Sequence, residues 1–170
     1  MKLAYTALGG LLGVLVLTLP ALTAEKTVVG WIEKVRIFPG NFLVHAKLDS
    51  GAKTCSLDAS NLEYFRRDGK KWVRFDLEER REGKKLTIER PLLRWVPIKR
   101  HNEAPQRRPV IRLGVCLGQV YKVTEVNLVD RTNYQYPMLI GRQFMQGAFA
   151  IDPAAKYTVA PTCKEPVSLE

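Results

Sequence analysis

Alternation between apolar and polar residues is the feature that most constrains how this chain folds. From Phe42 to Asp49, apolar residues at the even positions alternate with mostly polar residues at the odd positions. A period of two is typical of a half-buried β-strand, because successive side chains point to opposite faces of a sheet. The turn sequence Pro39-Gly40-Asn41 precedes this segment, and the β-rich run Val28 to Ile37 precedes the turn. The pattern favours an all-β fold.

Further strand signals continue along the chain, and helix signals are few. Asp68-Gly69-Lys70 predicts a turn, and His101 to Pro109, with two prolines, predicts an exposed loop. The remaining elements that we expect are a strand at Trp72–Leu77, a hairpin arm within Leu86–Ile98, two strands in Val110–Val129 broken at Gly118-Gln119, short strands at Met138–Ile140 and Gly147–Ile151, and a helical turn at Arg142–Gln146.

The length of 170 residues corresponds to one domain, and no linker marks a second. The chain has no G-x-x-x-x-G-K-[ST] phosphate loop, no G-x-G-x-x-G and no H-E-x-x-H motif. Three cysteines without a C-x-x-C pair are too few for a disulfide scaffold and exclude a zinc ribbon or finger. We expect neither a metal nor a cofactor.

The first 24 residues read as a targeting segment. Lys2 is followed by an uncharged run that extends to Ala24, with Pro20 near its end and small residues at Thr23 and Ala24. This arrangement predicts a signal peptide at 1–24 and a mature domain at 25–170, exported to a bacterial periplasm. An uncleaved segment that anchors the chain to the inner membrane is the alternative, because the uncharged run is long enough to span a bilayer.

The positive charge is concentrated in one part of the chain. Residues 66–112 hold 16 basic and seven acidic side chains, whereas the segments on either side are balanced. One interpretation is a solvated face, and the other is a surface that attracts a polyanion or an acidic peptide. Nucleic acid is a poor candidate partner, because no recognised nucleic-acid motif is present and the leader directs the chain to the envelope.

The segment Asp49-Ser50-Gly51-Ala52 is the main candidate for chemistry. It places a carboxylate at the end of the alternating strand, a hydroxyl beside it, and a glycine where another backbone can approach closely. An aspartic protease needs these features in each half of its catalytic dyad. By itself, so short a motif is a weak signal, because many matches are only turns.

A second segment, Tyr136 to Arg142, places a hydrophobic strand and a glycine before the expected helical turn. With D-S-G-A upstream and this Gly-Arg segment downstream, the chain resembles the retropepsin-like aspartic proteases. It is similar, more narrowly, to the bacterial family historically labelled ATP-dependent zinc proteases. The blocks that carry the resemblance are 30–33, 46–52, 72–75, 108–110, 127–131, 136–142 and 151–153.

The resemblance implies a single-lobe, closed β-barrel that acts as a homodimer, with Asp49 from each subunit forming the dyad. Ser50, Gly51, Ala52, Gly141 and Arg142 would support the active-site loop. Its implied function is that of an aspartic endopeptidase of the bacterial envelope, a hydrolase that acts on peptides or proteins. The carboxylate that pairs with the arginine in retroviral enzymes is replaced here by a lysine, so the partner of the arginine is left open.

The "zinc" and "ATP" parts of the family label do not fit the sequence. The only histidines are His45 and His101, and they lack metal-ligand spacing. A different function class also fits the fold, namely a catalytically silent module that binds a peptide or an envelope polyanion. Failure to dimerise would favour that alternative.

The resemblance also implies a flap over the substrate, here expected around Lys84 to Arg108. Its candidate substrate contacts are Arg94, Trp95 and Arg100, and its charge predicts a preference for acidic substrates. Among the cysteines, Cys55 is expected to be buried, and Cys116 and Cys163 either form a disulfide or remain separate.

Overall fold

The computed structural model describes residues 25–79, 83–100 and 103–164. Eleven strands and one short helix make up this part of the chain. They are β1 (Thr27–Phe38), β2 (Phe42–Asp49), β3 (Cys55–Asp58), β4 (Ser60–Arg67), β5 (Lys70–Glu79), β6 (Lys84–Pro91), β7 (Arg94–Arg100), β8 (Glu103–Leu117), β9 (Val120–Val129), β10 (Met138–Gly141), α1 (Arg142–Met145) and β11 (Phe149–Lys156). No helix within the described residues is both long and apolar enough to cross a membrane.

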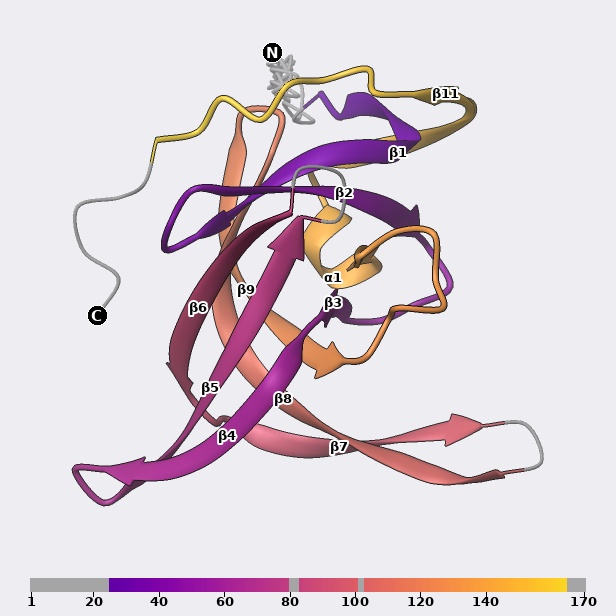
Figure 1. Cartoon of the computed structure of the whole chain (residues 1–170). Helices are drawn as coiled ribbons and strands as arrows, with labels where there is room; N and C mark the ends of the chain where they lie inside the picture. Colours follow the sequence, from indigo (N-terminus) through magenta and orange to yellow (C-terminus); the bar gives the residue numbers. More distant parts are fainter. Residues whose placement is uncertain (1–24, 80–82, 101–102, 165–170) are drawn as a thin grey trace, which may run out of the picture.

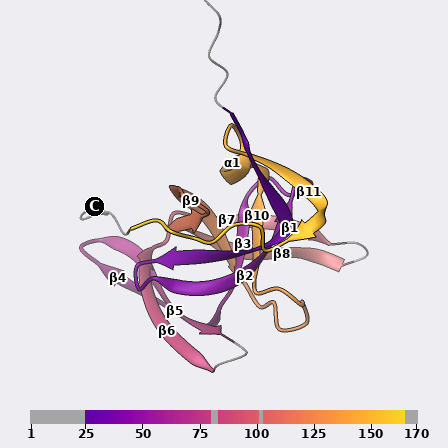
Figure 2. The same ribbon diagram turned by 90° about the horizontal axis from the view of Figure 1, so that it is seen from above.

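The strands form two sheets (Figure 1). The larger sheet is mixed and has the order β11-β1-β2-β10-β3-β9-β8-β7, with a further pairing between β1 and β8. The smaller sheet, β4-β5-β6, is antiparallel and lies at the lower left of Figure 1. Figure 2 shows β11 beside β1, with which it pairs in parallel. The chain is therefore nearly all-β, as the sequence predicts.

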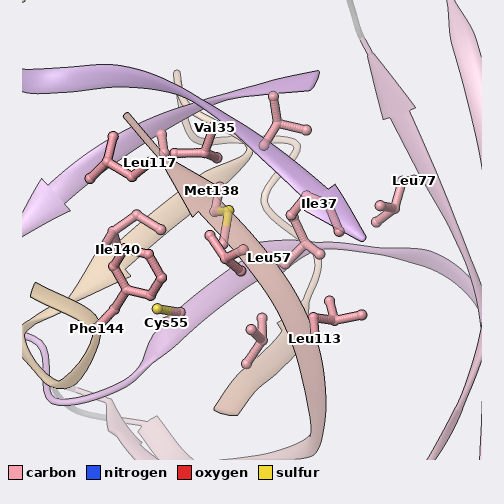
Figure 3. Packing of buried hydrophobic residues seen from close by; sticks show 14 of the residues in the cluster. Val35, Ile37, Cys55, Leu57, Leu77, Leu113, Leu117, Met138, Ile140 and Phe144 are labelled. Atoms are coloured by element: carbon pink, nitrogen blue, oxygen red, sulfur yellow. The ribbon is translucent and has the colours of Figure 1, made fainter. Parts of the chain in front are cut away.

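The hydrophobic core contains side chains from both sheets, most of them from the larger one. Apolar residues of β1 and β2 that alternate in the sequence, such as Val35, Ile37 and Val44, are buried there. Figure 3 shows Met138 and Ile140 of β10 among side chains from other strands, with Phe144 of α1 at the edge of the cluster. Burial of these side chains is the main stabilising contribution, at roughly 25 cal/mol per Å² of apolar surface.

Two contacts tie the C-terminal segment to the sheet. Glu33 on β1 is completely buried, and its Oε1 accepts hydrogen bonds from the amides of Gly30 and Thr158, both at 2.8 Å, and from the hydroxyl of Thr158 at 2.7 Å. Cys116 and Cys163 form a disulfide. Of the two alternatives that the sequence leaves open for Cys116 and Cys163, the disulfide is therefore the correct one. Cys55 is a buried thiol outside any disulfide, as expected.

Most of the predicted elements are confirmed, including the break between β8 and β9 at Gly118-Gln119 and the helical turn after β10. The predicted loop at His101–Pro109 is wrong, because residues from Glu103 onward belong to β8. The flap expected at Lys84–Arg108 is not one unit either. Its first part is β6 of the smaller sheet, and only the part from Arg94 forms the β7–β8 arm. The signal-peptide segment lies outside the described residues and stays a prediction.

Candidate functional site

Asp49 ends β2 at a tight turn. The backbone amide of Gly51 donates to the Asp49 carboxylate at 2.9 Å, and the amide of Ala52 donates to the Asp49 carbonyl at 3.3 Å. Asp49 is half-buried, whereas Ser50 and Gly51 are exposed. The turn thus fixes the carboxylate at the end of the strand and presents it at the surface.

Strand β10 lies beside this turn and supports it. It runs parallel to β2, with Gly141 in register with Asp49. A Cβ at Gly141 would lie 2.5 Å from the carbonyl oxygen of Thr54, so only glycine allows the two backbones to approach this closely. The amide of Arg142 donates to the Ala52 carbonyl at 2.9 Å, which joins α1 to the turn.

The side chain of Arg142 completes the support of the loop. Its guanidinium donates to the carbonyls of Ser50 at 3.2 Å and Gly51 at 3.1 Å. The partners of Arg142, which the sequence leaves open, are therefore two backbone carbonyls and not a carboxylate. The predicted loop residues Asp49, Ser50, Gly51, Ala52, Gly141 and Arg142 are therefore brought together, although their role in chemistry stays a prediction.

Cys55 lies buried behind the loop, where the Gly141 amide donates to its sulfur at 3.5 Å. Burial raises the pKa of the Cys55 thiol to about 11, and hydrogen bonds with Gly141 and Thr124 oppose this shift. The thiol is therefore neutral at neutral pH, and Cys55 has the character of a packing residue rather than a nucleophile.

A groove of about 1090 Å³ opens beside Asp49, and we call it the basic groove. Two acidic side chains, Asp49 and Glu125, contribute to its lining. Six cationic side chains also line it, and these are Lys47, Lys53, Arg94, Arg108, Arg112 and Arg131. Electrostatics in the basic groove therefore favour an anionic ligand.

The β7–β8 arm, at the edge of the larger sheet, forms one wall of the basic groove and extends to the right in Figure 1. Arg94 lines the basic groove together with Asp49, and its predicted contact with a substrate stays a prediction. Trp95 points to the other face of the arm, where it lines a second cavity of about 720 Å³ with Tyr64 and Arg107. The side chain of Arg100 lies outside the described residues.

Sequence reasoning singled out Arg94 but did not place Lys47, Lys53 or Arg112 at the site. Arg112 follows Val110 and Arg108 at two-residue steps, so the alternation along β8 contained the signal that these side chains share a face. In the part of the chain that the structure describes, no three His, Cys, Asp or Glu side chains come together to hold a metal ion.

The arrangement of an Asp-Ser-Gly-Ala turn against a Gly-Arg strand in a mixed β-sheet defines a retropepsin-like protein. The family model described as "RimB-like: Retropepsin-like aspartic endopeptidase RimB" matches residues 28–162. The chain belongs to this RimB-like family, which confirms the resemblance seen in the sequence.

A solved structure and several curated proteins are also similar. The crystal structure of a Legionella pneumophila protein of unknown function superposes with a TM-score of 0.69 at 31% identity, and covers 79% of this chain and 98% of that one. A protein of Desulfotalea psychrophila is 33% identical over 72% of this chain, and one of Parasynechococcus marenigrum is 32% identical over 67%. Both are named "Probable alpha-L-glutamate ligase". The chain spans 27% and 25% of their lengths, about a quarter of each.

These names correct the predicted activity. All four curated relatives are named as ligases, which form bonds, whereas the sequence predicted a peptide hydrolase. The prediction of an aspartic endopeptidase, and with it the classification as a protease, is therefore overturned by the relatives. The physical reason is that the D-S-G-A and Gly-Arg motifs specify how a loop is held, and do not by themselves specify a reaction.

Proposed function

We propose that this chain binds glutamate-rich peptides in the basic groove and serves α-L-glutamate ligase chemistry as a recognition module. The observation that carries the proposal is the excess of cationic side chains in the groove, six against two acidic ones. A chain of glutamates is a flexible polyanion, and such a groove complements it.

The names of the relatives support glutamate as the anion. Each is named "Probable alpha-L-glutamate ligase", and each matches this chain over about a quarter of its own length. A ligase that extends a peptide by glutamate has a glutamate-terminated peptide as its product. A module that holds such peptides fits beside that activity.

The chemistry of the side chains suits carboxylates. Arginine presents a planar fork of donors that binds a carboxylate with two parallel hydrogen bonds, and Arg94, Arg108 and Arg112 provide three such forks on one wall. Lys47 on β2 and Lys53 after the Asp49 turn add point charges to the lining. Asp49 itself repels a carboxylate ligand, so it disfavours binding close to the turn.

Fluorescence anisotropy with a labelled hexaglutamate peptide tests the proposal. We expect binding that weakens as salt is raised, because salt screens partly exposed charges over about 8 Å at physiological ionic strength. Arg112→Gln should weaken binding about two- to fivefold, the contribution of one partly exposed ion pair. Lys70→Gln is the matched control, because it removes the same charge at the exposed β4–β5 turn, away from the groove.

Two outcomes would contradict the proposal. Equal binding of hexaglutamate and hexalysine would show that the charge of the groove does not select the ligand. An equal loss of affinity in Arg112→Gln and Lys70→Gln would show that only the net charge of the protein matters.

We also propose that the larger sheet closes into a barrel and that the chain forms a homodimer. The pairing of β1 with β8, which joins strands far apart in the sheet order, supports closure. The exposed turn at Ser50 and Gly51 supports a contact between copies at the Asp49 loop. Light scattering at micromolar concentration tests the dimer, and a strict monomer would refute it.

A further inference from the structure

The β7–β8 arm presents its arginines to the basic groove at regular intervals. Arg108 and Arg112 are four residues apart on β8, and Arg94 on β7 lies directly opposite Val110, between them. Directly paired residues lie on the same face of an antiparallel sheet, so the three arginines share one face. Trp95 and Arg107, each next to one of these arginines in the sequence, point to the opposite face and line the second cavity, which Arg108 also lines. We call Arg94, Arg108 and Arg112 the arginine ladder.

The spacing of the arginine ladder equals that of alternate side chains in an extended peptide. Successive levels of the ladder are two residues apart, which corresponds to about 6.8 Å along a β-strand. In an extended ligand, the side chains of residues i, i+2 and i+4 also lie on one face at steps of about 6.8 Å. Three glutamates at alternate positions can therefore meet three arginines at once.

One arginine of the ladder, Arg94, already has a carboxylate partner within the protein, and this partner is Glu125. Its carboxylate accepts a hydrogen bond from Arg94 and forms an ion pair with it. Glu125 also lies directly opposite Arg112 in the pairing of β8 with β9. A guanidinium has five donors, so Arg94 can serve a second carboxylate while it retains Glu125, although Glu125 repels that carboxylate.

We infer that the arginine ladder reads glutamates at alternate positions of an extended peptide, and that Glu125 weakens this binding as an internal competitor at its central level. The inference rests on the proposed function and deepens it, because it assigns a conformation and a residue spacing to the ligand. The arginines act here as specificity-determining residues and not merely as a source of positive charge.

Two capped nine-residue peptides test the spacing. Each contains four glutamates and five serines, so that length, composition and charge are identical. One carries glutamates at positions 1, 3, 5 and 7, and the other at positions 1, 2, 5 and 6. In the first peptide, three glutamates at successive two-residue steps lie on one face and can meet all three arginines. In the second peptide, each face carries only two glutamates, which are four residues apart and can meet only Arg108 and Arg112.

We expect the alternating peptide to bind about two- to fivefold more tightly in calorimetry, which is the contribution of the one additional ion pair, to Arg94. Arg94→Gln should bring the ratio of the two affinities close to one, whereas the matched control Lys70→Gln should leave the ratio unchanged. Glu125→Gln should raise the ratio, and Glu78→Gln, which removes an exposed carboxylate paired with Lys85 outside the groove, should not.

The outcomes separate the inference from the proposed function. Equal, salt-sensitive binding of both peptides would overturn the arginine ladder and leave the proposed function standing. A preference that persists in Arg94→Gln would also overturn the ladder. Binding of neither peptide, nor of hexaglutamate, would overturn both.

Discussion

Replacement of Gly141 by alanine tests how the Asp49 turn is held against β10. The Cβ of an alanine would lie 2.5 Å from the Thr54 oxygen, 2.6 Å from the Thr54 carbonyl carbon and 2.9 Å from the Lys53 carbonyl carbon. All three are backbone atoms, so no side chain can rotate away. Such overpacking costs about 1–3 kcal/mol.

The displaced backbone also carries hydrogen bonds. Arg142 and Gln143 donate their amides to the carbonyls of Ala52 and Lys53 at 2.9 and 3.1 Å, and separation of the two segments weakens both bonds. At about 0.5–1.5 kcal/mol for each bond, the expected loss in the free energy of unfolding rises to about 2–6 kcal/mol in total. For a domain of this size, that corresponds to a fall in Tm of very roughly 5–15 °C.

Urea unfolding and thermal unfolding of Gly141→Ala measure this loss. Gly83→Ala is the control, because its Cβ meets nothing within 4 Å and its φ of +68° costs about 1–2 kcal/mol by itself. If Gly141→Ala is no less stable than Gly83→Ala, the close approach of the two backbones does not hold the turn as we describe.

Three other predictions concern the interior and the C-terminal segment. Cys55 should resist alkylation in the native protein at pH 8 and react only after unfolding, and rapid labelling of the native protein would contradict this. Because burial raises the pKa of the Cys55 thiol from its ordinary value of 9.0 to about 11, stability should also fall as the pH rises from 9 toward 11. Glu33→Gln should lower the free energy of unfolding by about 2–4 kcal/mol, because the buried carboxylate accepts hydrogen bonds from Gly30 and Thr158, and unchanged urea unfolding would refute that role. The double change of Cys116 and Cys163 to serine should cost about 4 kcal/mol, the loop-closure value for a separation of 47 residues, measured against the oxidised wild type.

The sequence predicts those strands in which burial follows a simple pattern. In β2, the buried even positions and the more exposed odd positions reproduce the alternation that is visible in the residues. In β4, by contrast, every residue is exposed or half-buried, so its sequence carries no apolar period and the strand was missed. Pro105 and Pro109 make the first part of β8 resemble a loop in the sequence, yet this part of the arm pairs only with the edge strand β7, where proline is tolerated.

The candidate site was predictable in its local parts and not in its assembly. The Asp49 turn and the Gly141-Arg142 step are contiguous motifs, and the structure brings them together. The basic groove depends on the register of β7 against β8, which places Arg94 beside residues that lie 14 to 18 positions further along the chain. Single-sequence reasoning recognised the charge of this segment but could not supply that register.

The D-S-G-A motif predicts the geometry of the loop correctly, but it does not predict the reaction. Asp49 has the loop geometry that the retropepsin-like resemblance implies, while the relatives are named for ligation. The charge of the groove is a more direct guide to the ligand, because it follows from the side chains themselves.

Amide chemical-shift mapping with hexaglutamate tests the central claim most directly. With ¹⁵N-labelled protein at low salt, we predict that the largest shifts fall on the lining of the basic groove, at Lys47, Lys53, Arg94 and Arg112. The exposed lysines Lys70 and Lys71 at the far end of the smaller sheet should change little. Shifts spread evenly over both sets of cations, or no shifts at any concentration up to a millimolar excess, would contradict the claim.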